Sequence, residues 1–106
     1  MKYKQKIYIA GKISDLPVSE YTEKFRLASL LLLFCGYEPV NPLDFCSDII
    51  SGRWLDYMER CLDMLPQCDG IYLLRDWKYS SGAIIEQRVA EIIQALNPDF
   101  EILYQE

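Results

Sequence analysis

Residues 70–74, GIYLL, form a nearly continuous apolar run that precedes a polar segment at residues 76–81. Such a run is typical of a strand covered on both faces, as in a parallel sheet. A second β-rich run, KIYIA, occupies residues 6–10, and two further runs lie at residues 37–40 and 100–104. Segments of helical pattern separate them, so the order β-α-β-α-β-α-β predicts a parallel sheet with helices on both faces.

Three helices are expected between these strands. Their apolar positions recur at helical spacing over residues 18–35, 53–65 and 82–96. Gly36 follows the first predicted helix at the C′ position, where glycine is favoured. Pro66 comes directly after the second, which is expected to end before it. Residues 43–52 are interpreted as a loop with at most a helical turn. Right-handed crossovers favour a doubly wound, flavodoxin-like sheet of four or five strands in the order 2-1-3-4, in a single domain over residues 1–106.

The composition excludes several partners. The 106-residue chain has a net charge of −5 and no long basic run, which disfavours binding to a nucleic acid backbone. Its longest apolar run, residues 27–35, is too short to cross a membrane, which takes about 20 residues. The N-terminus lacks the features of a secretory signal, so we expect a cytoplasmic protein.

The residue types also restrict the chemistry. The chain contains no histidine, which excludes Ser-His and Cys-His pairs and the usual zinc sites. The four cysteines form no C-x-x-C pair and are interpreted as buried reduced thiols, with a redox or metal role as the less favoured alternative; they are Cys35, Cys46, Cys61 and Cys68. We therefore expect neither a metal nor a cofactor.

Glu86 does not fit its surroundings on the last predicted helix. On a helical wheel it shares a stripe with Val89, Ala90 and Ile93, whereas Gln87 and the other polar residues lie on a different face. Burying an unpaired carboxylate is costly, so Glu86 requires a partner, a raised pKa or a ligand. The alternative is a glutamate that caps its own helix or pairs with a nearby cation.

The expected fold also indicates where a ligand would bind. In such sheets ligands lie beyond the carboxyl ends of the strands, which here nominates the loops at residues 11–16, 41–44 and 76–81. Ser80, Ser81 and Gly82 open the last helix, where free N–H groups and the helix dipole favour an anion. The alternative is a serine that simply caps the helix.

Four segments carry a resemblance to a known family. KIYIAG (residues 6–11), GYEPVNPLD (36–44), CDGIYLL (68–74) and SSGAIIE (80–86) resemble the DUF4406 family of small bacterial and phage proteins. That family is similar to the nucleoside 2-deoxyribosyltransferases and the 2′-deoxynucleoside 5′-phosphate N-hydrolases. The resemblance to DUF4406 extends over nearly the whole chain, and the resemblance to the enzymes rests on the tyrosine of the first strand and the S-x-G-x-x-x-E pattern.

The resemblance implies an enzyme that cleaves an N-glycosidic bond of a nucleoside or nucleotide. Glu86 matches the nucleophile and Tyr8 the tyrosine beside it. Ser80 matches a serine that binds a 5′-phosphate, which favours a nucleotide, and Lys12 would add a positive charge. The remaining expected substrate-binding residues are Gly11, Asp44, Ser81 and Gly82. The enzymes resembled form oligomers, so a homo-oligomer is expected.

The sequence differs from these enzymes at one catalytic position, so the group that protonates the leaving base is not identified. The enzymes carry a catalytic aspartate at the position of Cys61. Asp76 follows the carboxyl end of its strand, which is the correct end for it to replace this aspartate as the proton donor. Alternatively, a residue of a neighbouring subunit donates the proton, and Asp76 is only a loop carboxylate on the surface. Asp69 lies at the wrong end and is interpreted as structural.

Two other functions stay open at the level of sequence. The first is a nucleotide-binding module of the same fold without turnover, which the substitution at Cys61 favours. The second is an assembly protein whose aromatic residues form an interface. Trp54 is more typical of a core position, whereas Trp77 and Tyr79 lie in the polar loop and are candidates to stack on a base or to pack against a second subunit.

Overall fold

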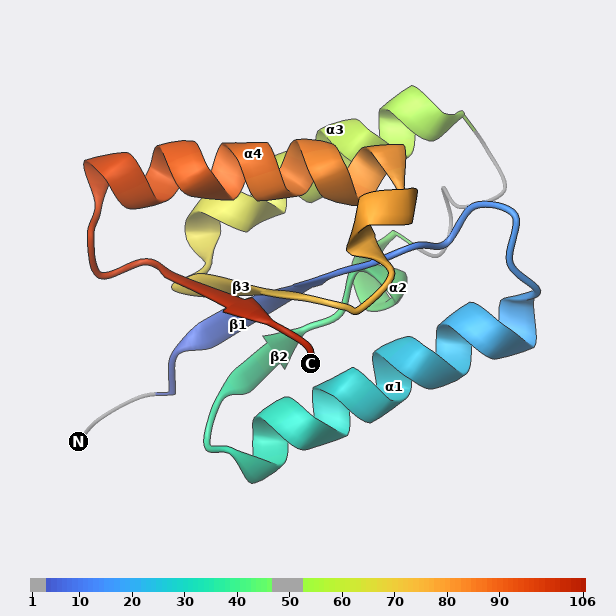
Figure 1. The fold of residues 1–106 in the computed structure, drawn as a ribbon, viewed down its shortest axis with the longest axis horizontal. Helices are drawn as coiled ribbons and strands as arrows, with labels where there is room; N and C mark the ends of the chain where they lie inside the picture. Colours follow the sequence, from blue (N-terminus) through green and yellow to red (C-terminus); the bar gives the residue numbers. More distant parts are fainter. Residues whose placement is uncertain (1–3, 47–52) are drawn as a thin grey trace.

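The structure is a computed structural model that describes residues 4–46 and 53–106 (Figure 1). Its four strands form one parallel sheet in the order β2-β1-β3-β4, which confirms the predicted topology. The strands are β1 (Lys6–Ala10), β2 (Glu38–Val40), β3 (Gly70–Leu73) and β4 (Glu101–Tyr104). The helices are α1 (Val18–Phe34), α2 (Pro42–Phe45), α3 (Trp54–Met64) and α4 (Ser81–Leu96), with 3-10 turns η1 (Leu65–Gln67) and η2 (Trp77–Tyr79).

Helices cover both faces of the sheet, as predicted. In Figure 1, α3 and α4 lie over one face and α1 over the other. The side chains of β1 alternate accordingly: Tyr8 belongs to the cluster under α3 and α4, whereas Ile7 and Ile9 pack with Phe25 of α1. All four side chains are fully buried. This alternation explains why the apolar runs of β1 and β3 are almost uninterrupted.

The end of α1 follows from Gly36. The N–H of Gly36 donates to the carbonyl of Leu33, and the N–H of Tyr37 donates to the carbonyl of Leu32. This pair of bonds is a Schellman motif, which needs a left-handed residue after the helix. Gly36 has a φ of 90°, a conformation that costs glycine little. The prediction that Gly36 ends the first helix is confirmed.

The helical turn allowed within residues 43–52 is present as α2, whose N-cap Asn41 accepts a hydrogen bond from the N–H of Leu43; residues 47–52 lie outside the described residues. Two other details differ from the sequence-based expectations. Gln87 is buried rather than solvated, because its amide donates to the hydroxyl of Tyr104 at 3.2 Å. Cys35 is exposed, so the interpretation as a buried thiol holds only for the other three cysteines.

The outer surface of α1 is unusually apolar. Phe34 is 90% exposed, and four leucines beside it are about half exposed: Leu27, Leu30, Leu31 and Leu33. The helical pattern of residues 18–35 therefore contains two apolar faces, of which only one contacts the sheet. No helix in the described part of the chain is long and apolar enough to cross a membrane.

Candidate functional site

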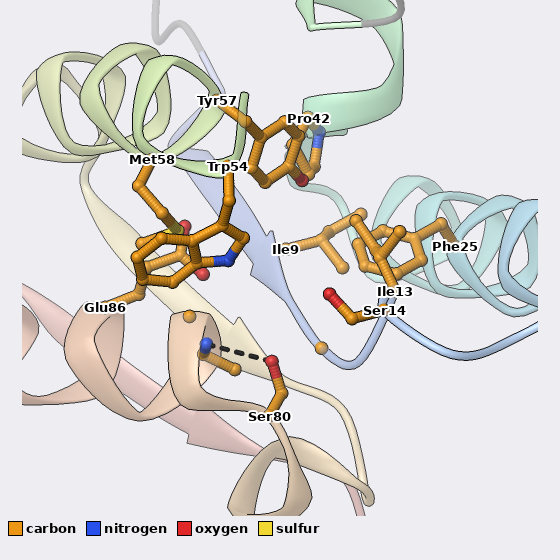
Figure 2. A pocket seen from close by; sticks show the side chains of 13 residues that line it. Ile9, Ile13, Ser14, Phe25, Pro42, Trp54, Tyr57, Met58, Ser80 and Glu86 are labelled. Atoms are coloured by element: carbon orange, nitrogen blue, oxygen red, sulfur yellow. Dashed lines mark hydrogen bonds between the residues drawn. The ribbon is translucent and has the colours of Figure 1, made fainter. Parts of the chain in front are cut away.

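A pocket opens beyond the carboxyl ends of β1 and β3, where the fold rule places a ligand (Figure 2). Its volume is about 180 Å³, and its walls come from β1, the loop after β1, α1, α2, α3 and the start of α4. The lining residues are Ile9, Gly11, Ile13, Ser14, Phe25, Pro42, Trp54, Tyr57, Met58, Ser80, Gly82, Ala83 and Glu86.

The start of α4 forms one wall of this pocket. Ser80 is the N-cap residue, and its hydroxyl oxygen accepts a hydrogen bond from the N–H of Ala83 at 3.2 Å. Gly82 lies against α3: a Cβ on this residue would come within 3.0 Å of the sulfur of Met58. Ser80 and Gly82 thus line the pocket as predicted, whereas Ser81 is exposed and lies outside the lining. The capping alternative for Ser80 is confirmed by this hydrogen bond.

Glu86 is the buried acid of the pocket. Its side chain is 5% exposed, and its Oε2 accepts a hydrogen bond from the hydroxyl of Tyr8. No salt bridge joins Glu86 to a cation among the described residues. Burial raises the pKa of Glu86 from an ordinary value of 4.5 to about 8, although the hydrogen bond from Tyr8 opposes that rise. The wheel-based prediction of an inward carboxyl is therefore confirmed, and the group titrates near neutral pH.

Tyr8 and Cys61 form a buried layer next to Glu86. Both side chains are fully buried, and the Sγ atoms of Cys61 and Cys46 lie 3.7 Å apart. Burial, with a smaller contribution from the charge of Glu86, raises the pKa of Tyr8 and that of Cys61 far above their ordinary values. Both groups therefore carry their protons at neutral pH. Next to Glu86 the protein therefore places a buried, neutral thiol.

Asp76 occupies a different environment. Its carboxylate pairs with the ammonium of Lys24 and accepts a hydrogen bond from the N–H of Lys12 at 3.1 Å. The side chain is 32% exposed and is not part of the pocket lining. These contacts join the loop after β3 to α1 and to the loop after β1. Lys12 contributes its backbone to this arrangement and does not line the pocket.

Some of the other predicted loop residues line the pocket and others lie outside it. Gly11 lines the pocket and packs so tightly that a Cβ would lie 2.6 Å from Cδ1 of Leu74. Asp44 is exposed on α2 and does not line the pocket; Pro42, the first residue of that helix, lines it instead. Asp69 accepts a hydrogen bond from the N–H of Lys6 at 2.8 Å, at the opposite end of the sheet. That contact supports the structural role expected for Asp69.

The aromatic residues are arranged differently from the sequence-based interpretation. Trp77 packs against Tyr104, with ring centroids 5.9 Å apart, and Tyr79 is 78% exposed. Neither lines the pocket, whereas Trp54 and Tyr57 do. The helical periodicity placed both on the inward face of α3. It did not show that the inward face of the first turn of this helix forms part of a pocket wall.

No group of three or more potential metal ligands occurs within residues 4–46 and 53–106. The described site consists instead of one buried carboxyl, one hydrogen-bonded tyrosine and a largely apolar wall. Such an arrangement suits a nucleophile or general acid–base group acting on a bound organic molecule.

The comparisons with known proteins agree with the sequence-based resemblance at the level of the family. The model of the family described as "Domain of unknown function (DUF4406)" matches residues 5–96. A search of curated proteins finds no match. The matched range includes β1 with Tyr8, all of α3 and all of α4 with Glu86. This chain therefore belongs to the DUF4406 family.

Proposed function

We propose that this protein cleaves the N-glycosidic bond of a nucleoside or nucleotide, with Glu86 as the nucleophile. The observation that carries the proposal is a buried carboxyl that lines a pocket at the carboxyl end of a parallel sheet. The resemblance to nucleoside 2-deoxyribosyltransferases and 2′-deoxynucleoside 5′-phosphate N-hydrolases supports the choice of substrate. The product sugar is transferred to water or to a second base, as a hydrolase or a transferase.

In the proposed reaction, Oε1 of Glu86 attacks the anomeric carbon while the bond from that carbon to the base nitrogen breaks. The electron pair of the broken bond leaves with the base, which takes a proton. The result is a glycosyl ester on Glu86, formed through an oxocarbenium-like transition state. Water or an acceptor base then attacks the same carbon, and the Glu86 carboxylate is released.

Tyr8 positions the nucleophile in this proposal. Its hydroxyl donates to Oε2, which leaves Oε1 as the attacking oxygen. The hydrogen bond also stabilises the ionised carboxylate against burial, so it keeps the pKa of Glu86 from rising further. Because only the ionised form attacks, base release is expected to increase with pH up to about 8.

The source of the proton for the leaving base is a separate question. Asp76 would have to leave its ion pair with Lys24 to act as this donor, and it does not line the pocket. Solvent water that enters the pocket is the simpler source. The role of Asp76 as the acid stays a prediction, and a substitution described in the Discussion tests it.

The test is to follow free base by chromatography after incubation with a panel of nucleosides and 5′-monophosphates, with and without an acceptor base. Glu86→Gln is expected to lower the rate on the order of 10⁴-fold, because the amide cannot form the ester intermediate. Glu91→Gln is the matched control, since it makes the same change at an exposed position of α4. Equal activity of Glu86→Gln and the unaltered protein would overturn the proposal.

The second candidate is a nucleotide-binding module without turnover. The fully buried thiol of Cys61 favours it, because the enzymes resembled have a catalytic aspartate there. In this case no member of the panel releases base, while one of them stabilises the protein against heat or binds in calorimetry. Glu86→Gln then retains or strengthens binding, because the neutral amide removes the cost of a buried charge.

We also propose that the protein self-associates, as the enzymes it resembles do. The exposed apolar surface of α1 supports this proposal, since contiguous apolar patches commonly mark interaction surfaces. Light scattering coupled to size-exclusion chromatography measures the mass directly. A Leu30→Glu variant is expected to reduce that mass if α1 forms the contact, and a monomeric unaltered protein would contradict the proposal.

A further inference from the structure

The walls of the pocket differ in chemical character. Eight lining residues present apolar or aromatic side chains: Ile9, Ile13, Phe25, Pro42, Trp54, Tyr57, Met58 and Ala83. Three present polar groups: Ser14, Ser80 and Glu86. Among the described residues that line the pocket there is no lysine or arginine. A ligand that fits both walls has a large planar or apolar part joined to a smaller part rich in hydroxyl groups.

Trp54 stands out on the apolar wall. It is the first residue of α3, one turn before Met58, and it is 42% exposed although it lines the pocket. Figure 2 shows its indole directed into the pocket from α3, with Ser14 and Ile13 across the cavity. A tryptophan in this position offers a broad apolar surface to a bound molecule and retains a polar N–H.

The second tryptophan provides an internal comparison. Trp77 packs against the ring of Tyr104 and contributes to the core under α4. Within the part of the chain that the structure describes, no aromatic ring pairs with Trp54 in this way. The indole of Trp54 is therefore available to stack on a planar group of a ligand.

We propose that Trp54 is the base-stacking residue of the pocket, and that the ligand carries a planar heteroaromatic base held against its indole. This inference rests on the proposed function, because it places the base on Trp54 and the attached sugar toward Glu86 and Ser80. It assigns the aromatic contact to α3 rather than to Trp77 and Tyr79 of the loop after β3. The side chains are consistent with this placement, since α3 offers the apolar surfaces of Trp54, Tyr57 and Met58 to the base. The start of α4 offers the polar groups of Ser80 and Glu86 to the sugar.

Fluorescence provides a direct test. The chain has two tryptophans, so a Trp77→Phe variant emits from Trp54 alone. Titration with the nucleosides and 5′-monophosphates of the panel is expected to change this emission in a saturable way. The base-free sugars 2-deoxyribose and 2-deoxyribose 5-phosphate are the controls and are expected to leave it unchanged. Binding detected by calorimetry without any change in Trp54 emission would overturn the proposal, and so would a lack of binding by every nucleoside and nucleotide.

Affinity measurements on the unaltered background test the same inference if Trp77→Phe does not fold. Trp54→Ala is expected to weaken binding of the best ligand about ten-fold or more, and Trp54→Phe to restore part of that loss. Leu55→Ala is the matched control, because Leu55 is the next residue, is 61% exposed and does not line the pocket. Equal affinities of Trp54→Ala and Leu55→Ala would overturn the stacking role.

The outcomes separate this inference from the proposed function. Base release that depends on Glu86 but is insensitive to Trp54→Ala, with unchanged affinity, would overturn stacking and leave the chemistry intact. Saturable quenching of Trp54 without any base release would support stacking and overturn turnover, as expected of a binding module.

Discussion

Glu86 and Asp76 are two carboxylates near the same end of one sheet, and their surroundings differ in almost every respect. Asp76 is partly exposed, pairs with Lys24 and accepts the N–H of Lys12. Glu86 is buried and lines the pocket, and its Oε2 accepts a hydrogen bond from Tyr8. The ammonium of Lys24 and the N–H of Lys12 both contact the carboxylate of Asp76. Among residues 4–46 and 53–106 no cation forms a salt bridge with Glu86, so burial destabilises its charge and makes its protonation state responsive to pH and to a ligand.

The largest expected effect tests the burial of Glu86. Below pH 4.5 this carboxyl is protonated in the folded and unfolded states alike. Between 4.5 and about 8 the unfolded chain loses the proton while the folded protein keeps it, so the free energy of unfolding falls as pH rises. The fall is at most about 1.4 kcal/mol per pH unit. Above about pH 8 the loss is complete.

Urea unfolding at a series of pH values measures this dependence. The profile of Glu86→Gln is expected to lack it, because the amide does not ionise, so the difference between the two profiles isolates the group. Identical pH profiles for the two proteins would show that Glu86 has an ordinary pKa and would remove the contrast with Asp76.

The next effect concerns the hydrogen bond that Tyr8 donates to Glu86. Tyr8→Phe removes the hydroxyl that stabilises the carboxylate, so the pKa of Glu86 is expected to rise further. A hydrogen bond to a charged group contributes about 1.5–3 kcal/mol, which corresponds to about one or two pKa units. Carbon-13 NMR of labelled glutamate carboxyls measures the shift. Tyr79→Phe, at an exposed position, is the control and is expected to leave the titration unchanged.

Asp76→Asn tests the other side of the comparison. The amide cannot neutralise Lys24 and is a weaker acceptor for the N–H of Lys12, so the free energy of unfolding is expected to fall by about 1–2 kcal/mol. Asp63→Asn, on the exposed surface of α3, is the control. A variant that unfolds like the unaltered protein but no longer releases base would instead assign Asp76 the role of the acid.

The smallest effect is the coupling between Lys24 and Asp76. In a double-mutant cycle with Lys24→Met and Asp76→Asn, the interaction is expected to contribute about 0.5–1 kcal/mol, since both side chains are partly solvated. The same unfolding measurements provide it. A coupling of zero would indicate that Asp76 acts through the N–H of Lys12 alone.

Much of the fold could be predicted from periodicity. The buried runs at residues 6–10 and 70–74 identify the two central strands, because strands covered on both faces are apolar at every position. Gly36 marks the end of α1 because the chain there needs a positive φ. The position of Glu86 on an apolar stripe likewise predicted its burial, because residues along a helix are related by fixed angles.

Other features could not be predicted from the sequence, because they depend on contacts between distant residues. Gln87 lies on the polar side of the wheel, yet it is buried because the hydroxyl of Tyr104, seventeen residues later, accepts its amide proton. Asp76 is a candidate acid because of its place after β3, and its ion pair with the distant Lys24 could not be predicted from the sequence. Trp54 and Tyr57 line the pocket together with residues of β1, α1, α2 and α4, and the periodicity of α3 alone does not show that these elements meet.

The sequence by itself therefore determined the strand order, the helical segments and the inward direction of Glu86, since each follows from local periodicity and from the handedness of the connections. The resemblance placed Tyr8 beside that carboxyl, but only the tertiary structure decided the hydrogen bond between them and the other groups that surround Glu86. Tyr8 lies seventy-eight residues from Glu86 along the chain and Cys61 belongs to another helix, and they come together through packing across one face of the sheet. The chemistry of Glu86 depends on those neighbours, because burial and hydrogen bonding set its pKa.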